Sequence, residues 1–198
     1  YEELAMEYEK NRRLYHDMNN HNLVMWKLAE KGEDERLHKY IGKLRPLEKD
    51  RHRQWTQNLI LDMILEYKLL AMEKKKILYE IKTDMIGEIA LADKELCILL
   101  GNLLDNAIEA CEKLEEEKRM VKIEVRKHHS MFMLIVENSC EAHAQVRKGI
   151  FRTTKKDDRM HGYGIHNVRK TVKNRGGQFQ YGSRGENFYV KILIPLVI

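Results

Sequence analysis

Gly101-Asn-Leu-Leu-Asp-Asn-Ala-Ile-Glu-Ala-Cys111 is the most informative stretch of the sequence for the fold. It lies inside a strongly apolar helix predicted over residues 94–113, yet it carries several polar side chains. Asn102 and Asn106 are four residues apart and therefore share one helix face. Amide and carboxylate oxygens on such a face either cap loops and satisfy backbone groups, or hold a Mg²⁺ ion that carries nucleotide phosphates.

The segments around this helix predict an α+β fold. Alternating apolar residues indicate strands on both sides of the helix, and a second helix is expected to begin after Gly164 and to end at Gly176-Gly177. Two closing strands form a hairpin across residues 182–185. Because the pattern lacks a regular βαβ rhythm, we expect helices on one face of a mixed sheet. The expected strands contain Ile77, Tyr79 and Ile81; Val121, Ile123 and Val125; Phe132, Leu134 and Val136; Phe179; and Phe188 to Ile194.

A second candidate site motif is His161-Gly-Tyr-Gly-Ile-His-Asn-Val168. Glycines 162 and 164 precede a predicted helix, where backbone N–H groups can turn toward an anion. Alone, this pattern is commonly a plain turn. The residues before it are basic or carry hydroxyls: Thr153, Thr154, Lys155 and Lys156. Together with Gly162 and Gly164 they fit either a lid over a triphosphate or a solvated basic loop.

The N-terminal part of the chain is predicted to be helical. Residues 1–31 contain neither Gly nor Pro, and their apolar residues recur at steps of three and four. Gly32 interrupts this pattern, and Asp34 can cap the next helix. The apolar spacing resumes over residues 59–70. Two long antiparallel helices are too thin to enclose a core, so we expect a homodimer in which a second copy completes a four-helix bundle.

Composition sets broad limits on function. The chain has 36 Lys and Arg against 31 Asp and Glu, a net charge of +5, which argues only weakly for nucleic acid because a basic surface binds any phosphate. Three scattered cysteines indicate reduced thiols and a cytoplasmic location. No apolar run reaches the roughly 18 residues of a membrane span. The chain does not begin with Met, so we expect a longer parent protein with any membrane part outside this sequence.

Together, NLLDNAIEAC, ENSC, TTK and HGYGIHNV resemble the ATP-binding GHKL (Bergerat) domain shared by histidine kinases, gyrase, Hsp90 and MutL, over residues 76–198. Residues 1–75 resemble the dimerisation and phosphotransfer region of Agr-type peptide-pheromone receptor kinases, through Tyr15-His-Asp-Met-Asn-Asn-His21 and Asn58-x-x-x-Asp62-x-x-Leu65. The resemblance implies an α+β protein with an N-terminal helical hairpin followed by an α/β sandwich. It further implies the cytoplasmic part of a bacterial membrane receptor.

The resemblance also implies roles for individual residues. His16 matches the phosphate-accepting histidine, with His21 as the nearest rival, and Asp17 would take or polarise its ring proton. Asn20 matches a position that orients water for dephosphorylation of the partner, an aspartate-bearing response regulator. ATP and Mg²⁺ are the implied cofactors. Their implied contacts are Asn102 and Asn106 for metal and phosphate, Asn138 for adenine, and Thr153, Thr154, Lys155, Gly162 and Gly164 for the lid.

Two departures from the family pattern leave alternatives open. Asn138 stands where many members have an adenine-reading Asp, and Glu109 stands where some histidine kinases have a phosphate-binding Lys. An amide oxygen can still accept a hydrogen bond from the adenine amino group. Asn102 replaces the water-activating Glu of ATP-hydrolysing clamps and anti-sigma serine kinases, which argues against both. A degenerate kinase acting as a dimeric docking platform is the main alternative, and a DNA-binding module has only the pI of 9.0 in its favour.

Overall fold

The computed structural model describes residues 2–44, 54–141 and 163–196. The chain forms two compact units, residues 1–51 and residues 52–198, which we call the N-terminal unit and the C-terminal unit. Each unit is described by itself. None of the described helices is both long enough and apolar enough to cross a membrane.

The N-terminal unit consists of α1 (Glu2–Glu30) and α2 (Asp34–Leu44). Gly32 separates the two helices with φ = +65°, a backbone conformation that glycine adopts without strain. The helices contact each other, and His21 Nδ1 lies 2.8 Å from the hydroxyl of Tyr40 on α2. Four large apolar side chains of α1 are exposed: Met18, Leu23, Val24 and Trp26. The four-helix bundle, in which a second copy would cover them, stays a prediction.

The described part of the C-terminal unit contains a mixed five-stranded sheet in the order β1-β2-β3-β5-β4. β1 runs parallel to β2, and the other neighbours are antiparallel. This arrangement confirms the predicted α+β class and the closing hairpin, which turns at Gly185. The strands are β1 (Leu78–Thr83), β2 (Met120–His128), β3 (Met131–Ser139), β4 (Gln178–Arg184) and β5 (Asn187–Pro195).

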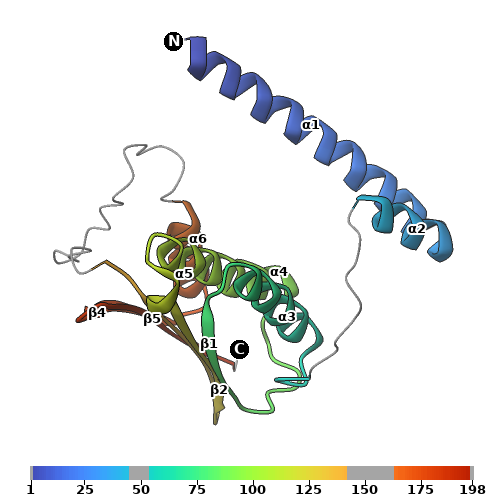
Figure 1. The fold of residues 1–198 in the computed structure, drawn as a ribbon. Helices are drawn as coiled ribbons and strands as arrows, with labels where there is room; N and C mark the ends of the chain where they lie inside the picture. The colour runs from blue at the N-terminus through green and yellow to red at the C-terminus, as the bar shows by residue number, and fades with distance from the viewer. Residues whose placement is uncertain (1, 45–53, 142–162, 197–198) are drawn as a thin grey trace. The chain divides into compact units, whose positions relative to one another are not determined.

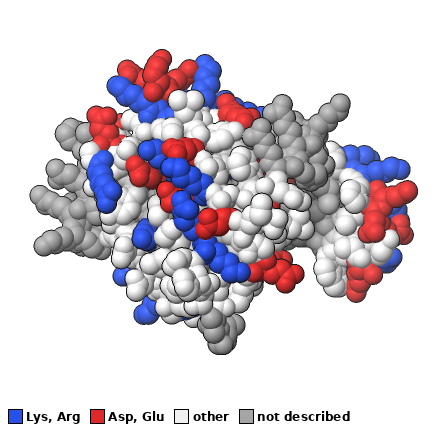
Figure 2. Space-filling model, turned by 90° about the horizontal axis from the view of Figure 1, so that it is seen from below, with Lys and Arg blue, Asp and Glu red and all other residues white. Residues whose placement is uncertain are grey.

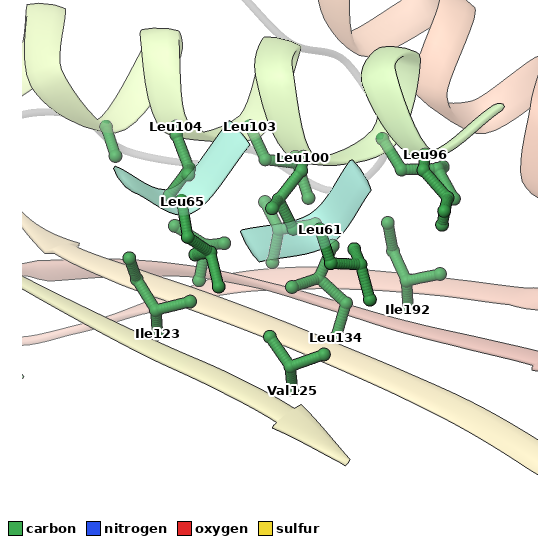
Figure 3. Packing of buried hydrophobic residues seen from close by; sticks show 14 of the residues in the cluster. Leu61, Leu65, Leu96, Leu100, Leu103, Leu104, Ile123, Val125, Leu134 and Ile192 are labelled. Carbon is green, nitrogen blue, oxygen red and sulfur yellow. The ribbon is translucent and has the colours of Figure 1, made fainter. Parts of the chain in front are cut away.

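Helices cover one face of this sheet (Figure 1). They are α3 (Leu59–Lys74), α4 (Asp93–Leu96), a π-helical turn η1 (Cys97–Gly101), α5 (Asn102–Cys111) and α6 (Tyr163–Asn174); a short 3₁₀ helix, η2 (Glu116–Lys118), precedes β2. Figure 3 shows leucines from α3, α4, η1 and α5 pointing at inward-facing residues of the sheet, Ile123, Val125, Leu134 and Ile192. Strand residues alternate in burial, as expected for a sheet with one covered face.

The boundary between the two units differs from the predicted division at residues 75 and 76. α3 belongs to the C-terminal unit, because Leu61, Leu65 and Met72 are fully buried in the same core as the sheet. Of the predicted apolar stripe over residues 59–70, Ile60 and Ile64 pack against this core, whereas Leu59 and Met63 are 72% and 56% exposed in the single chain. α3 has apolar residues around most of its circumference, so spacing alone could not identify the buried side. The helical hairpin predicted for residues 1–75 stays a prediction.

The outer face of the sheet carries charges of both signs. Lys82 pairs with Glu80 at 2.9 Å, and Arg126 lies 3.4 Å from Glu124. Figure 2 shows acidic and basic side chains alternating in short rows across the face in view. The visible face therefore does not form one continuous basic surface of the kind that tracks a nucleic-acid backbone.

Candidate functional site

A π-helical turn places the polar face of α5. The helix that begins at Asp93 widens over Cys97–Gly101 before Asn102 begins α5. Such turns are frequent at functional sites because they shift the following side chains around the helix axis. The opposite side of α5 is anchored in the core, with Leu103, Leu104, Ala107, Ile108 and Cys111 all buried. The two asparagines therefore have a fixed position on the other side.

Asn102 meets the start of α6. Its Nδ2 donates to the carbonyl of Ile98 within the π turn at 2.7 Å, which fixes the amide and leaves Oδ1 available. A Cβ atom built on Gly164 would lie 3.1 Å from that Oδ1, which is tighter than an ordinary van der Waals contact. The close approach explains a glycine at position 164, and it brings together two motifs that are far apart in the sequence.

Asn106 has an unsatisfied polar atom. Among the described residues, its Nδ2 is one of two buried side-chain nitrogens without a hydrogen-bond partner. Leaving a buried donor unpaired costs about 1–3 kcal/mol, and such groups in native proteins occur at sites that wait for a ligand or ion. An amide oxygen is a suitable Mg²⁺ ligand beside nucleotide phosphates, which supply further oxygens. Asn102 and Asn106 thus fit the predicted metal and phosphate positions.

Asn138 lies at the end of β3 and is 5% exposed. Its Nδ2 donates to the carbonyl of Ser139 at 2.8 Å, which leaves its Oδ1 as the acceptor that an adenine amino group requires. The C-terminal end of α5 lies beside this strand end, because the Cys111 thiol donates to the Ser139 carbonyl at 3.7 Å. Burial raises the pKa of this thiol, as expected for a cysteine that packs in the core.

The remaining predicted lid residues cannot be placed. Thr153, Thr154, Lys155 and Gly162 lie outside the described residues, and of the lid only Gly164 is described. No group of three or more His, Cys, Asp or Glu side chains in the described ranges is arranged to hold a metal ion.

His16 lies on α1 with 75% of its side chain exposed. Its Nδ1 is 3.2 Å from Asn20 Nδ2 and 3.7 Å from Asp17 Oδ1. One helical turn thus brings together the three predicted catalytic residues on the same side of the ring. By contrast, His21 is partly buried and held by Tyr40, as expected for a structural histidine.

The Asn58 to Asp62 spacing has a structural explanation. Asn58 caps α3 by accepting a hydrogen bond from the Leu61 N–H at 3.1 Å. Asp62 accepts from both the N–H and the hydroxyl of Thr56, each at 2.8 Å. These contacts, with the hydrogen bond from Asn58 Nδ2 to the Gly87 carbonyl at 3.0 Å, hold the start of α3 in the C-terminal unit and give the motif a structural role.

Two ion pairs that join helices could not be predicted from the sequence. Lys68 on α3 contacts Asp105 on α5, and Arg175, which follows α6, makes two hydrogen bonds to Glu95 on α4 at 2.8 and 2.5 Å. Their partners are 37 and 80 residues apart, so only the packed structure reveals them. The second pair fixes the end of α6 against the helix that leads into the π turn.

The Glu95–Arg175 pair predicts an acid-dependent loss of stability. The hydrogen bonds from Arg175 lower the pKa of Glu95 below its ordinary value. Its stabilisation is therefore fully present above the ordinary carboxyl pKa and disappears as the pH falls through the lowered one. We expect Glu95→Gln to reduce the free energy of unfolding by about 1–2 kcal/mol at pH 7, with the difference vanishing in acid. Urea unfolding between pH 7 and pH 3 measures this change.

The matched control for this prediction is Glu115→Gln. Glu115 pairs with Lys118 at 2.8 Å on the surface, where ion pairs contribute little. Removing this carboxylate should leave the unfolding curve unchanged at every pH. A Glu95→Gln protein that is equally destabilised at pH 7 and pH 3 would show that the ion pair is not the source of the effect.

The C-terminal unit is an α/β sandwich in which α5 has a polar face, and comparison with known proteins assigns this fold to a family. The GHKL domain family matches residues 91–195, more than half of the 198-residue chain. The chain belongs to the GHKL domain family. No curated protein sequence matches the chain.

Solved structures share the fold at low sequence identity. The catalytic domain of histidine kinase ThkA is 20% identical with a TM-score of 0.55, over 69% of this chain and 90% of that chain. Acinetobacter baumannii histidine kinase AdeS is 16% identical with a TM-score of 0.52, over 84% of this chain and 82% of that chain. At these identities, the likeness shows a common fold.

Proposed function

We propose that this protein is the cytoplasmic catalytic part of a sensor histidine kinase, which uses Mg-ATP to phosphorylate His16 and passes the phosphoryl group to an aspartate of a response regulator. The observation that carries the proposal is the exposed His16, with Nδ1 engaged by its neighbours, on a helical unit joined to a GHKL domain. GHKL domains also occur in proteins that are not kinases. The exposed histidine in the same chain, with a carboxylate and an amide beside its ring, is what favours a kinase.

The surroundings of His16 favour attack through Nε2. The Asp17 carboxylate, 3.7 Å from Nδ1, favours the tautomer in which Nδ1 carries the ring proton. Rotation of the Asn20 amide by 180° would exchange Nδ2, now 3.2 Å from Nδ1, for the amide oxygen, which can accept that proton. Nε2 then has a free lone pair directed away from both neighbours. Asp17 also stabilises the positive charge that develops on the ring as Nε2 bonds to phosphorus. After phosphorylation of the partner regulator, Asn20 is in position to orient a water molecule for the reverse, phosphatase reaction.

The C-terminal unit would supply the nucleotide. Asn106 and Asn102 would hold Mg²⁺ and phosphate oxygens through their amides, and Asn138 would accept a hydrogen bond from adenine. Bound Mg²⁺ neutralises charge on the phosphates and so assists transfer of the terminal phosphoryl group. Gly164 permits the start of α6 to approach Asn102 closely, and Thr153, Thr154, Lys155 and Gly162 would complete a lid over the phosphates.

We further propose that the chain acts as a homodimer within a bacterial membrane receptor of the Agr type. The exposed apolar residues of α1 support a four-helix bundle formed with a second copy. Attachment to the membrane would depend on a sensor region N-terminal to this sequence, and direct contact with nucleic acid is not expected. The alternative function is a docking platform that binds nucleotide without transferring phosphate.

Incubation with Mg²⁺ and γ-labelled ATP tests the proposal. We expect the label to become attached to the protein in a linkage that is acid-labile and base-stable, as a phosphohistidine is. The reaction should require Mg²⁺. A protein that binds Mg-ADP in calorimetry but acquires no label, even with its native N-terminal region restored, would favour the docking platform.

A further inference from the structure

Lys68 is a nearly buried lysine whose amine contacts Asp105, the residue that precedes Asn106 on α5. Its side chain is 11% exposed, and its Nζ lies 2.5 Å from Asp105 Oδ1. The Asp105 side chain is 57% exposed. Lysine is almost never this buried unless its charge is paired. The pair is therefore asymmetric, with a cation held in the protein interior and an anion at the surface of α5.

Asp105 lies beside the face that carries Asn102 and Asn106. It immediately precedes Asn106, and Glu109, which is also exposed, follows one turn later. At about 100° per residue, Asp105 and Glu109 lie together along one edge of the helix face that carries the two asparagines. Two carboxylates thus adjoin the surface proposed to receive nucleotide phosphates. Uncompensated, the negative charge of Asp105 would repel a bound polyphosphate.

We propose that Lys68 is a positioning residue that neutralises Asp105 and so makes the polar face of α5 electrostatically suitable for nucleotide phosphates. The inference rests on the proposed function, because it assumes that this face binds nucleotide. A purely structural role is the competing explanation, since the pair also joins α3 to α5. The two explanations differ in what they predict for the two partners.

If the pair only joined the helices, removal of either partner would have the same effect on nucleotide binding. If Lys68 acts by neutralising Asp105, the two removals have opposite effects. Lys68→Met leaves an uncompensated carboxylate at the site, whereas Asp105→Asn removes that carboxylate and keeps the lysine charge. The affinity for nucleotide, compared with the melting temperature, separates the explanations.

The experiment measures the Kd of Mg-ADP by isothermal titration calorimetry on the whole chain, at low salt and at physiological salt. Lys68→Met is expected to weaken binding about fivefold at low salt, and by less at physiological salt, because ions screen an exposed charge. Asp105→Asn should bind at least as tightly as the wild type. The double variant Lys68→Met/Asp105→Asn should return to within about twofold of the wild type.

Lys75→Met is the matched control. Lys75 directly follows α3 and pairs at 2.8 Å with Glu112, which directly follows α5, so the pair joins the ends of the same two helices away from the two asparagines. Its removal should lower the melting temperature slightly and leave the Kd unchanged. The inference is overturned if Lys68→Met binds like the wild type, if Asp105→Asn weakens binding as much as Lys68→Met, or if the double variant stays weak. A wild type that does not bind Mg-ADP would instead overturn the proposed function.

Discussion

His16→Gln is expected to abolish phosphorylation of the chain completely, while His21→Gln should retain it. Gln has no ring nitrogen that can attack phosphorus, so no label can form at position 16. His21 is held against α2 by Tyr40, and its replacement removes only a packing contact. The amount of label after incubation with Mg²⁺ and γ-labelled ATP measures both effects.

The two histidine variants also control for each other. Both substitutions are made on α1, and His16 is the more exposed of the two, so His16→Gln should disturb the helix less. Circular dichroism should therefore show a helix content close to that of the wild type for His16→Gln. Label that persists in His16→Gln and disappears in His21→Gln would assign the phosphate acceptor to the rival position.

Asn106→Ala is expected to weaken Mg-ADP binding by about tenfold or more without lowering stability. The loss follows from removing an amide that would contact the metal and the charged phosphates, where one interaction is worth about 1.5–3 kcal/mol. Stability should be unchanged or slightly higher, because the buried Nδ2 has no partner among the described residues and alanine removes this orphaned donor. Calorimetric titration and thermal unfolding of the same preparation measure the two quantities.

Asn187→Ala provides the control for this prediction. Asn187 donates to Glu137 at 3.1 Å and lies opposite Ser139 on the neighbouring strand. Its removal therefore deletes an amide of the same size that is not proposed to contact the metal or the phosphates. It should leave nucleotide affinity intact. If Asn106→Ala lowered the melting temperature by several degrees and kept its affinity for Mg-ADP, Asn106 would be a structural residue.

Much of the C-terminal unit could be predicted from local pattern. The strands follow from alternation of apolar residues, and the hairpin follows from the glycines around position 185, because both signals depend on neighbouring residues. The polar face of α5 followed from the spacing of Asn102 and Asn106 alone. The π turn before it was not foreseen, since its five residues read as ordinary apolar helix.

The features that sequence did not reveal depend on contacts between distant segments. α3 was assigned to the N-terminal helices because its apolar residues allow more than one buried face, and only packing on the sheet selects Leu61 and Leu65. The same limit applies to Lys68, which looks like a surface lysine in the sequence. Its burial against Asp105 is visible only once α3 and α5 are packed together.

The most direct test of the central claim is to determine which atom carries the phosphoryl group. After reaction of the whole chain with Mg-ATP, fragmentation mass spectrometry would locate the modified residue, and phosphorus–proton NMR would identify the ring nitrogen. The account predicts phosphate on Nε2 of His16. Phosphate on another residue, or a protein that binds Mg-ADP and is never phosphorylated, would contradict it.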